Sequence, residues 1–184
     1  IEKIDKILEK VKSDPEDEFI KLYEIKLWEE IRNMAVKGRR TGLGVTGEGD
    51  MLAALGLTYG TDEATDFSVS VHKELKLSAY RSSVELAKER GCFPVFNKDN
   101  EINNPFILRI KEEDLELYNN IQKYGRRNIA LLTIAPAGSV SICTQTTSGI
   151  EPAFNVVYKR RRKVNPNDLN NRKAIRDITG DYFE

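Results

Sequence analysis

Apolar residues recur at helical spacing through the first 38 residues of the chain. The pattern falls into two series, divided by Ser13-Asp14-Pro15, in which Asp14 can cap a helix and Pro15 suits a first helical position. The two series are Ile1, Ile4, Ile7, Leu8 and Val11, then Phe19, Leu22, Tyr23, Leu27, Ile31 and Met34. We therefore expect residues 1–38 to be helical, restarted at Pro15 and packed on something larger.

Residues 39–60 combine a glycine-rich bend with a short apolar helix over 51–57. The stretch Gly42-Leu43-Gly44-Val45-Thr46-Gly47 matches GxGxxG literally. A dinucleotide fingerprint requires a strand before the glycines and an acidic residue at the end of a second strand. Here a helix precedes the glycines, so we interpret them as a bend where backbone packs closely on backbone.

A long helix is predicted between Thr61 and Gly91. Thr61, followed by two acids, is a typical N-cap, and Gly91 is a typical helix end. The expected apolar face consists of Phe67, Val71, Leu75 and Ala79. His72 is expected on the surface of this helix. Cys92 follows its C-terminus, where the helix dipole disfavours a thiolate, so we expect an unreactive thiol.

Beyond this helix, residues 93–96 and the asparagine-rich stretch 97–105 are predicted to be extended or loop. A helix is predicted over 112–124, with the acidic pair Glu112-Glu113 at its start and Gly125 at its end. The helices and loop of residues 61–127 form one part of the predicted domain.

Residues 128–135 (NIALLTIA) form a nearly unbroken apolar run of strand length, which is typical of strands covered on both faces in parallel sheets. A small-residue turn follows, residues 140–145 begin a helix, and residues 154–158 are a second candidate strand. The tail over 164–184 is polar. The expected fold class is therefore α/β and rich in helices.

Composition and charge narrow the range of possible functions. The 184 residues carry 29 basic and 29 acidic side chains, so the formal net charge is zero. This balance argues against a nucleic-acid or anionic-membrane binder, and no apolar run approaches the roughly 20 residues of a membrane helix. The length suits one domain. Because the chain begins at Ile1 and residues 1–12 lack the apolar core of a signal peptide, we expect a piece of a longer chain.

The two cysteines, Cys92 and Cys143, cannot form a disulfide framework, and free thiols favour a reducing cytoplasm. One histidine and two dispersed cysteines make a zinc site improbable, so no metal ligands are assigned. Cys143 is expected to be a buried, inert thiol. The cationic run Lys159–Lys163 is interpreted as a solvated strand end rather than a nucleic-acid contact.

The turn after residues 128–135 is the principal candidate site. A buried strand that ends in small residues and opens a helix presents free backbone N–H groups to an anion. Ala137 and Gly138 let a phosphate come close, and Ser139 and Ser141 add hydroxyl donors. The alternative is an ordinary strand-to-helix turn with Ser139 as its N-cap.

Three segments together resemble one enzyme family. In order they are GRRTGLGV from Gly38, LLTIAPAGSVS from Leu131 and TSGIEPAF from Thr147. They resemble the large catalytic subunit of ribonucleotide reductase, and most closely its adenosylcobalamin-dependent class II type, over most of residues 15–163.

The resemblance implies a fold and a chemistry. The fold would be part of a ten-stranded α/β barrel, with residues 128–163 supplying a strand, the phosphate-binding loop and a further strand. The substrate would be a ribonucleoside di- or triphosphate, reduced at the ribose 2′ position by radical chemistry with adenosylcobalamin and a thioredoxin-like reductant. The family's phosphate loop places Ala137, Gly138, Ser139, Val140 and Ser141 at the substrate phosphates. Ala137 departs from the family's usual threonine, so altered phosphate contacts are expected.

The family's radical-forming and redox cysteines have no counterpart here, so no catalytic residue is assigned. We expect a fragment that is inactive alone, needs the remainder of the catalytic subunit and forms homo-oligomers to cover an exposed strand edge. Two alternatives stay open: a non-catalytic nucleotide- or phosphate-binding module, and a helical interaction domain without a ligand.

Overall fold

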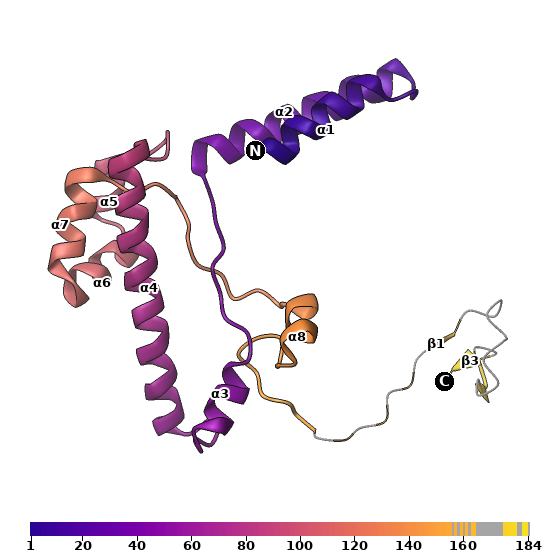
Figure 1. Ribbon diagram of the computed structural model, residues 1–184, viewed down its shortest axis with the longest axis vertical. Coiled ribbons are helices and arrows are strands. Elements are labelled where there is room, and N and C mark those ends of the chain that lie inside the picture. The colour runs from indigo at the N-terminus through magenta and orange to yellow at the C-terminus, as the bar shows by residue number, and fades with distance from the viewer. Residues whose placement is uncertain are drawn as a thin grey trace. The chain divides into compact units, whose positions relative to one another are not determined.

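The computed structural model describes residues 1–155, 157, 159, 161, 163–164, 175–179 and 182–183. The chain divides into two compact units, Ile1–Pro152 and Ala153–Glu184. The helices of the first unit are α1 (Glu2–Ser13), α2 (Glu18–Gly38), α3 (Glu48–Ala54), α4 (Asp62–Arg90), α5 (Lys98–Ile102), α6 (Pro105–Glu113), α7 (Leu115–Tyr124) and α8 (Gly138–Thr144) (Figure 1). The helix-rich character expected from the sequence is confirmed.

Helices α1 and α2 pack against each other as a hairpin, tied by Arg32 Nε and Asp5 Oδ1 at 2.6 Å. The predicted break between two helices is confirmed, but the predicted restart at Asp14 and Pro15 is wrong. Asp17 caps α2 instead, where its side chain accepts a hydrogen bond from the Phe19 N–H at 2.8 Å. Asp14 is instead the C-cap residue of α1, and α2 begins only at Glu18.

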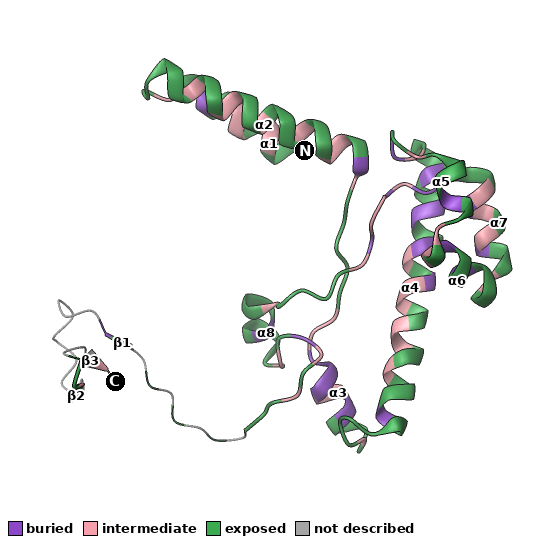
Figure 2. Cartoon of the chain, turned by 180° about the vertical axis from the view of Figure 1, so that it is seen from behind, coloured by how far each residue is buried: buried purple, intermediate pink, exposed green. Residues whose placement is uncertain are grey.

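Helix α4 begins and ends as predicted: Thr61 Oγ1 accepts a hydrogen bond from the Ala64 N–H, and Gly91 has a positive φ of 77°. The predicted apolar face is wrong. Phe67 is 37% exposed, and Val71, Leu75 and Ala79 are only partly buried. The buried apolar positions are Ala64, Leu77, Tyr80, Val84 and Ala87. Apart from Ala64, these positions lie in the C-terminal half of α4, which packs against α7 (Figure 2).

The predicted loop over residues 97–105 is also wrong in part, because its asparagines cap helices. The Asn97 side chain accepts from the Asp99 N–H, and the Asn104 side chain accepts from the Phe106 N–H. Helix α6 then ends, and α7 begins, at Asp114. The pair Glu112-Glu113 therefore closes α6 instead of opening a helix. Gly125 ends α7 as predicted.

The core lies where α4, α6 and α7 meet residue Leu131. Its buried members are Leu77, Tyr80, Val84, Ile107, Ile110, Leu117, Ile121 and Leu131. A buried ion pair borders this core: Arg126 Nη2 lies 2.7 Å from Glu101 Oε1, and Arg126 also donates to two main-chain carbonyls. Burial raises the pKa of the neighbouring Tyr80, an effect that Arg126 opposes.

Residues 41–44 and 129–133 run side by side as a parallel ribbon. The Leu43 N–H donates to Leu131 O at 2.7 Å, and the Thr133 N–H donates to Leu43 O at 3.0 Å. The ribbon contains one isolated bridge, Leu43 to Leu132, rather than the continuous strand predicted over 128–135. The predicted parallel direction is correct, but Thr133 and Ile134 are exposed, so the segment is not covered on both faces as predicted.

The glycines of the bend allow close backbone packing, as predicted, and do not follow a strand. A Cβ atom added at Gly42 would lie 2.8 Å from Thr133 Cγ2, and one added at Gly49 would lie 2.5 Å from Pro152 Cα. Gly44 is equally tight against the Thr133 carbonyl. These glycines are therefore explained by packing on the chain itself, and the dinucleotide interpretation is not needed.

The second unit contains β1 (Lys163–Val164), β2 (Ile175–Arg176) and β3 (Tyr182–Phe183), antiparallel and in the order β1-β3-β2. Residues 153–155 and 157 are not in a strand, whereas the rest of the predicted strand over 154–158 lies outside the described residues. In the cationic run, Arg160 and Arg162 also lie outside them. Arg161 pairs with Asp177 and holds the pKa of that carboxyl below its usual range.

Candidate functional site

The candidate phosphate turn lies between the ribbon and α8. Ala137 is the N-cap residue of α8, without a side-chain capping bond, so the alternative in which Ser139 caps the helix is wrong. The Ala137 N–H donates to Ser148 O at 3.0 Å and is therefore occupied. The first intrahelical bond is from the Ser141 N–H to Ala137 O at 2.8 Å.

The five predicted site residues differ in what they offer to a ligand. Gly138, Ser139 and Val140 are exposed, and no described residue accepts a hydrogen bond from their backbone N–H groups. Ser141 is buried, and its hydroxyl donates to Gly138 O at 2.8 Å. The turn therefore presents three main-chain donors and the Ser139 hydroxyl, whereas Ala137 and Ser141 support its shape.

Hydrogen bonds join the segment that holds this turn, residues 147–149, to the start of α3. The Gly47 N–H donates to Thr147 O at 3.0 Å, and the Glu48 N–H donates to Gly149 O at 3.2 Å. The Asp50 carboxylate accepts from the Thr147 N–H at 2.7 Å. Residues 47–50, which are far away in the sequence, thus meet the turn and residues 147–149 at the N-terminal ends of α3 and α8. Sequence spacing gave no signal for the contact made by Asp50.

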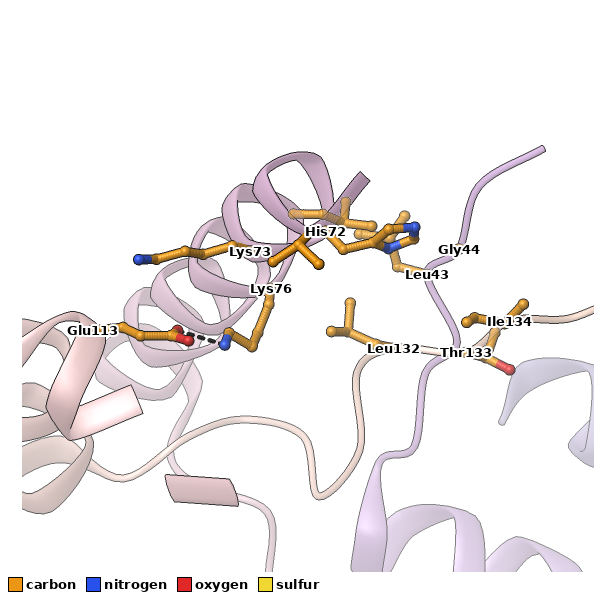
Figure 3. A pocket seen from close by; sticks show the side chains of 11 residues that line it. Leu43, Gly44, His72, Lys73, Lys76, Glu113, Leu132, Thr133 and Ile134 are labelled. Carbon is orange, nitrogen blue, oxygen red and sulfur yellow. Dashed lines mark ion pairs between the residues drawn. The ribbon is translucent and has the colours of Figure 1, made fainter. Parts of the chain in front are cut away.

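A cavity of about 520 Å³ lies beside the ribbon (Figure 3). Leu43, Leu132 and Ile134 supply apolar lining, and α4 supplies His72 and other residues. In Figure 3, Lys76 faces Glu113, with 2.5 Å between Nζ and Oε2.

His72 is not the simple surface residue that was predicted. It is partly buried, and its Nε2 lies 2.7 Å from Oε2 of Glu48, a residue that is itself only 8% exposed. The sequence contained no signal for this pair, because 24 residues separate its members.

The cysteines take no part in the turn. Cys143 is exposed on α8, so the prediction of a buried thiol is wrong, because the outer face of this short helix is uncovered. The Cys92 thiol donates to Tyr124 O at 3.1 Å. Across the described part of the chain, His, Cys, Asp and Glu form no cluster that could hold a metal ion. The helices in that same part include none with the length and apolar character needed to cross a membrane.

Comparisons with known proteins agree with the resemblance. The family described as "Ribonucleotide reductase, barrel domain" matches residues 17–183. The chain is 32% identical over 132 residues to the vitamin B12-dependent ribonucleoside-diphosphate reductase of Mycobacterium tuberculosis, a match that covers 71% of the chain and 16% of that protein.

Two further relatives match to a similar extent. The vitamin B12-dependent ribonucleoside-diphosphate reductase of Thermoplasma acidophilum is 30% identical over 132 residues, covering 72% of the chain and 15% of the relative. The ribonucleoside-diphosphate reductase subunit alpha of Treponema pallidum is 27% identical over 128 residues, covering 68% and 15%. The matched segment thus spans about one sixth of the length of these relatives.

Proposed function

The chain belongs to the ribonucleotide reductase barrel-domain family, and on that premise we propose that it supplies the substrate phosphate-binding loop of a ribonucleotide reductase. The complete enzyme would reduce a ribonucleoside di- or triphosphate to the 2′-deoxyribonucleotide by radical chemistry. The observation that carries the proposal is the exposed first turn of α8, where Gly138, Ser139 and Val140 present unoccupied N–H groups.

The role of the turn is electrostatic positioning. Main-chain N–H groups at a helix start can hold phosphate oxygens without any basic side chain, which suits a chain of zero net charge. The small Gly138 leaves space for the phosphate, since a Cβ added there would meet no atom within 4 Å. Holding the phosphates fixes the ribose near reactive groups that other parts of the subunit contribute.

The open ribbon favours a partial barrel over a self-contained binding module. Within the described residues, the predicted strand forms a β-bridge only between Leu132 and Leu43, and Ile134 is 64% exposed. A closed module would bury such an apolar edge. We therefore infer that further strands, from the remainder of the subunit or from another copy of this chain, complete the ten-stranded barrel.

Adenosylcobalamin is the cofactor proposed for the complete enzyme, because two of the relatives above are named vitamin B12-dependent. No described residue is assigned to hold it, because the one histidine of the chain, His72, is engaged by Glu48. The roles proposed for the described residues do not depend on the cofactor. Its contacts, and those of a thioredoxin-like reductant, are assigned to the remainder of the subunit.

Calorimetric titration tests the proposal. The 184-residue chain should bind ADP and should not bind adenosine, because the turn recognises phosphate rather than base or ribose. Equal binding of both ligands, or of neither, would refute the phosphate-binding role.

A further inference from the structure

The phosphate-binding turn is connected to α3 through one acidic side chain. Asp50 Oδ2 accepts the hydrogen bond of the Thr147 N–H at 2.7 Å. The next residue, Ser148, accepts the Ala137 N–H at 3.0 Å. Ala137 O in turn accepts the N–H of Ser141, which closes the first turn of α8. A short series of hydrogen bonds therefore runs from the Asp50 carboxylate to the turn.

Backbone hydrogen bonds also hold residues 47–48 against residues 147–149. The Gly47 N–H donates to Thr147 O, and the Glu48 N–H donates to Gly149 O. At Gly49 the two chains pack without room for a side chain, since an added Cβ would lie 2.5 Å from Pro152 Cα. Asp50 adds a side-chain bond to this backbone framework, and the bond is strong because its acceptor is a carboxylate.

We infer that Asp50 is a positioning residue for the phosphate-binding turn: it holds residues 147–148 where Ser148 can fix Ala137, and so aims the N–H groups of Gly138, Ser139 and Val140 at the ligand. This inference rests on the proposed function. It assigns Asp50 no contact with substrate.

A simpler interpretation is that Asp50 only stabilises α3, because acids in a first helical turn interact favourably with the helix dipole. Asp62 provides the matched comparison. It lies in the first turn of α4 and is exposed. If ADP binding weakens when Asp50 is changed but not when Asp62 is changed, the weakening is attributed to the hydrogen bond between Asp50 and Thr147.

The experiment compares Asp50→Ala, Asp50→Asn and the control Asp62→Ala in the 184-residue chain. Two quantities are measured: the exchange rates of the Thr147 and Ala137 amide hydrogens, and the Kd for ADP. Asp50→Ala should raise both exchange rates and weaken ADP binding by about tenfold or more, the scale expected for losing a charged hydrogen bond. Asp50→Asn keeps an oxygen acceptor and should recover most of both properties, and Asp62→Ala should resemble the wild type.

The outcomes separate the inference from the proposed function. Unchanged Thr147 and Ala137 exchange in Asp50→Ala would overturn the inference, whatever the ligand does. Faster exchange with unchanged ADP affinity would reduce Asp50 to a structural residue and would also overturn it. Absence of ADP binding by the wild-type chain would overturn the proposed function, and with it the ligand-positioning role. The exchange rates would still show whether the hydrogen bond of Asp50 stabilises the turn.

Discussion

Gly44 packs so closely on Thr133 that a Cβ atom at residue 44 would lie well under 3.0 Å from the Thr133 carbonyl oxygen. The obstacle is main chain rather than a flexible side chain, so it cannot move aside without opening the ribbon. This contact sets the spacing between the glycine bend and the segment that leads into the phosphate turn.

Gly44→Ala should therefore destabilise the chain by about 1–3 kcal/mol, the cost of overpacking a tight site. Urea unfolding followed by circular dichroism measures the change. Gly138→Ala is the matched control, because nothing lies within 4 Å of the added methyl group. Stability should stay within about 1 kcal/mol in that variant. Equal losses in the two variants would contradict the packing explanation.

The second prediction concerns the buried ion pair of Arg126 and Glu101. Glu101→Ala leaves a guanidinium only 4% exposed without its carboxylate, which should cost about 3–5 kcal/mol. On the surface, Lys88 pairs with Glu85, and Lys88→Ala should cost under about 1 kcal/mol. Thermal unfolding of both variants checks the contrast. Similar shifts in the two melting temperatures would show that burial does not set the importance of the Arg126 pair.

Acid sensitivity is predicted at Asp114. The hydrogen bond from the Leu117 N–H, together with Arg81, lowers the pKa of this carboxyl below its usual range. The ionised form is thus favoured in the folded state, so the stabilisation is present above about pH 4 and is lost as the pH falls through the lowered pKa. Asp114→Asn should flatten the decline of stability below pH 4, measured by urea unfolding at several pH values. An unchanged decline of stability below pH 4 in this variant would contradict the role assigned to Asp114.

The apolar residues of α2 predict self-association. Phe19, Leu22, Tyr23, Leu27 and Met34 are each more than half exposed. Apolar surface of this extent favours association. Sedimentation velocity should show a concentration-dependent increase in mass that Leu27→Glu reduces. The neighbouring Lys26→Glu should leave association unchanged, and an effect as large as that of Leu27→Glu would exclude the apolar face as its cause.

Capping residues in the sequence predicted the ends of some helices correctly. Thr61 and Gly91 mark the ends of α4 because capping depends on neighbouring residues. The asparagines at 97 and 104 misled the prediction, because the same side chains suit loops and caps. The turn at residues 136–141 was found through its small residues.

Long-range contacts could not be predicted in this way. His72 meets Glu48 across 24 residues, and Asp50 meets Thr147 across 97. No periodicity or spacing encodes such pairs, because they depend on how the segments fold together. The strand prediction over 128–135 failed for a related reason: an apolar run indicates burial, whereas a continuous strand also needs an uninterrupted ladder of hydrogen bonds to a partner, and here only Leu132 bridges to Leu43.

A fragment that lacks the family's radical-forming cysteine should be inactive alone. We predict no 2′-deoxyribonucleotide product when the 184-residue chain is incubated with a ribonucleotide, a dithiol reductant and adenosylcobalamin, as measured by chromatography. Product formation would show that the chain contains catalytic groups that this account does not assign.

The central claim is that the first turn of α8 binds phosphate, and residue-resolved NMR tests it most directly. Titration of the ¹⁵N-labelled chain with ADP should shift the amide signals of Gly138, Ser139 and Val140 in a saturable manner, and adenosine should not. The Gly60 amide, in the turn before α4, serves as the internal reference. Shifts absent from the three turn amides, or no larger there than at Gly60, would contradict the claim.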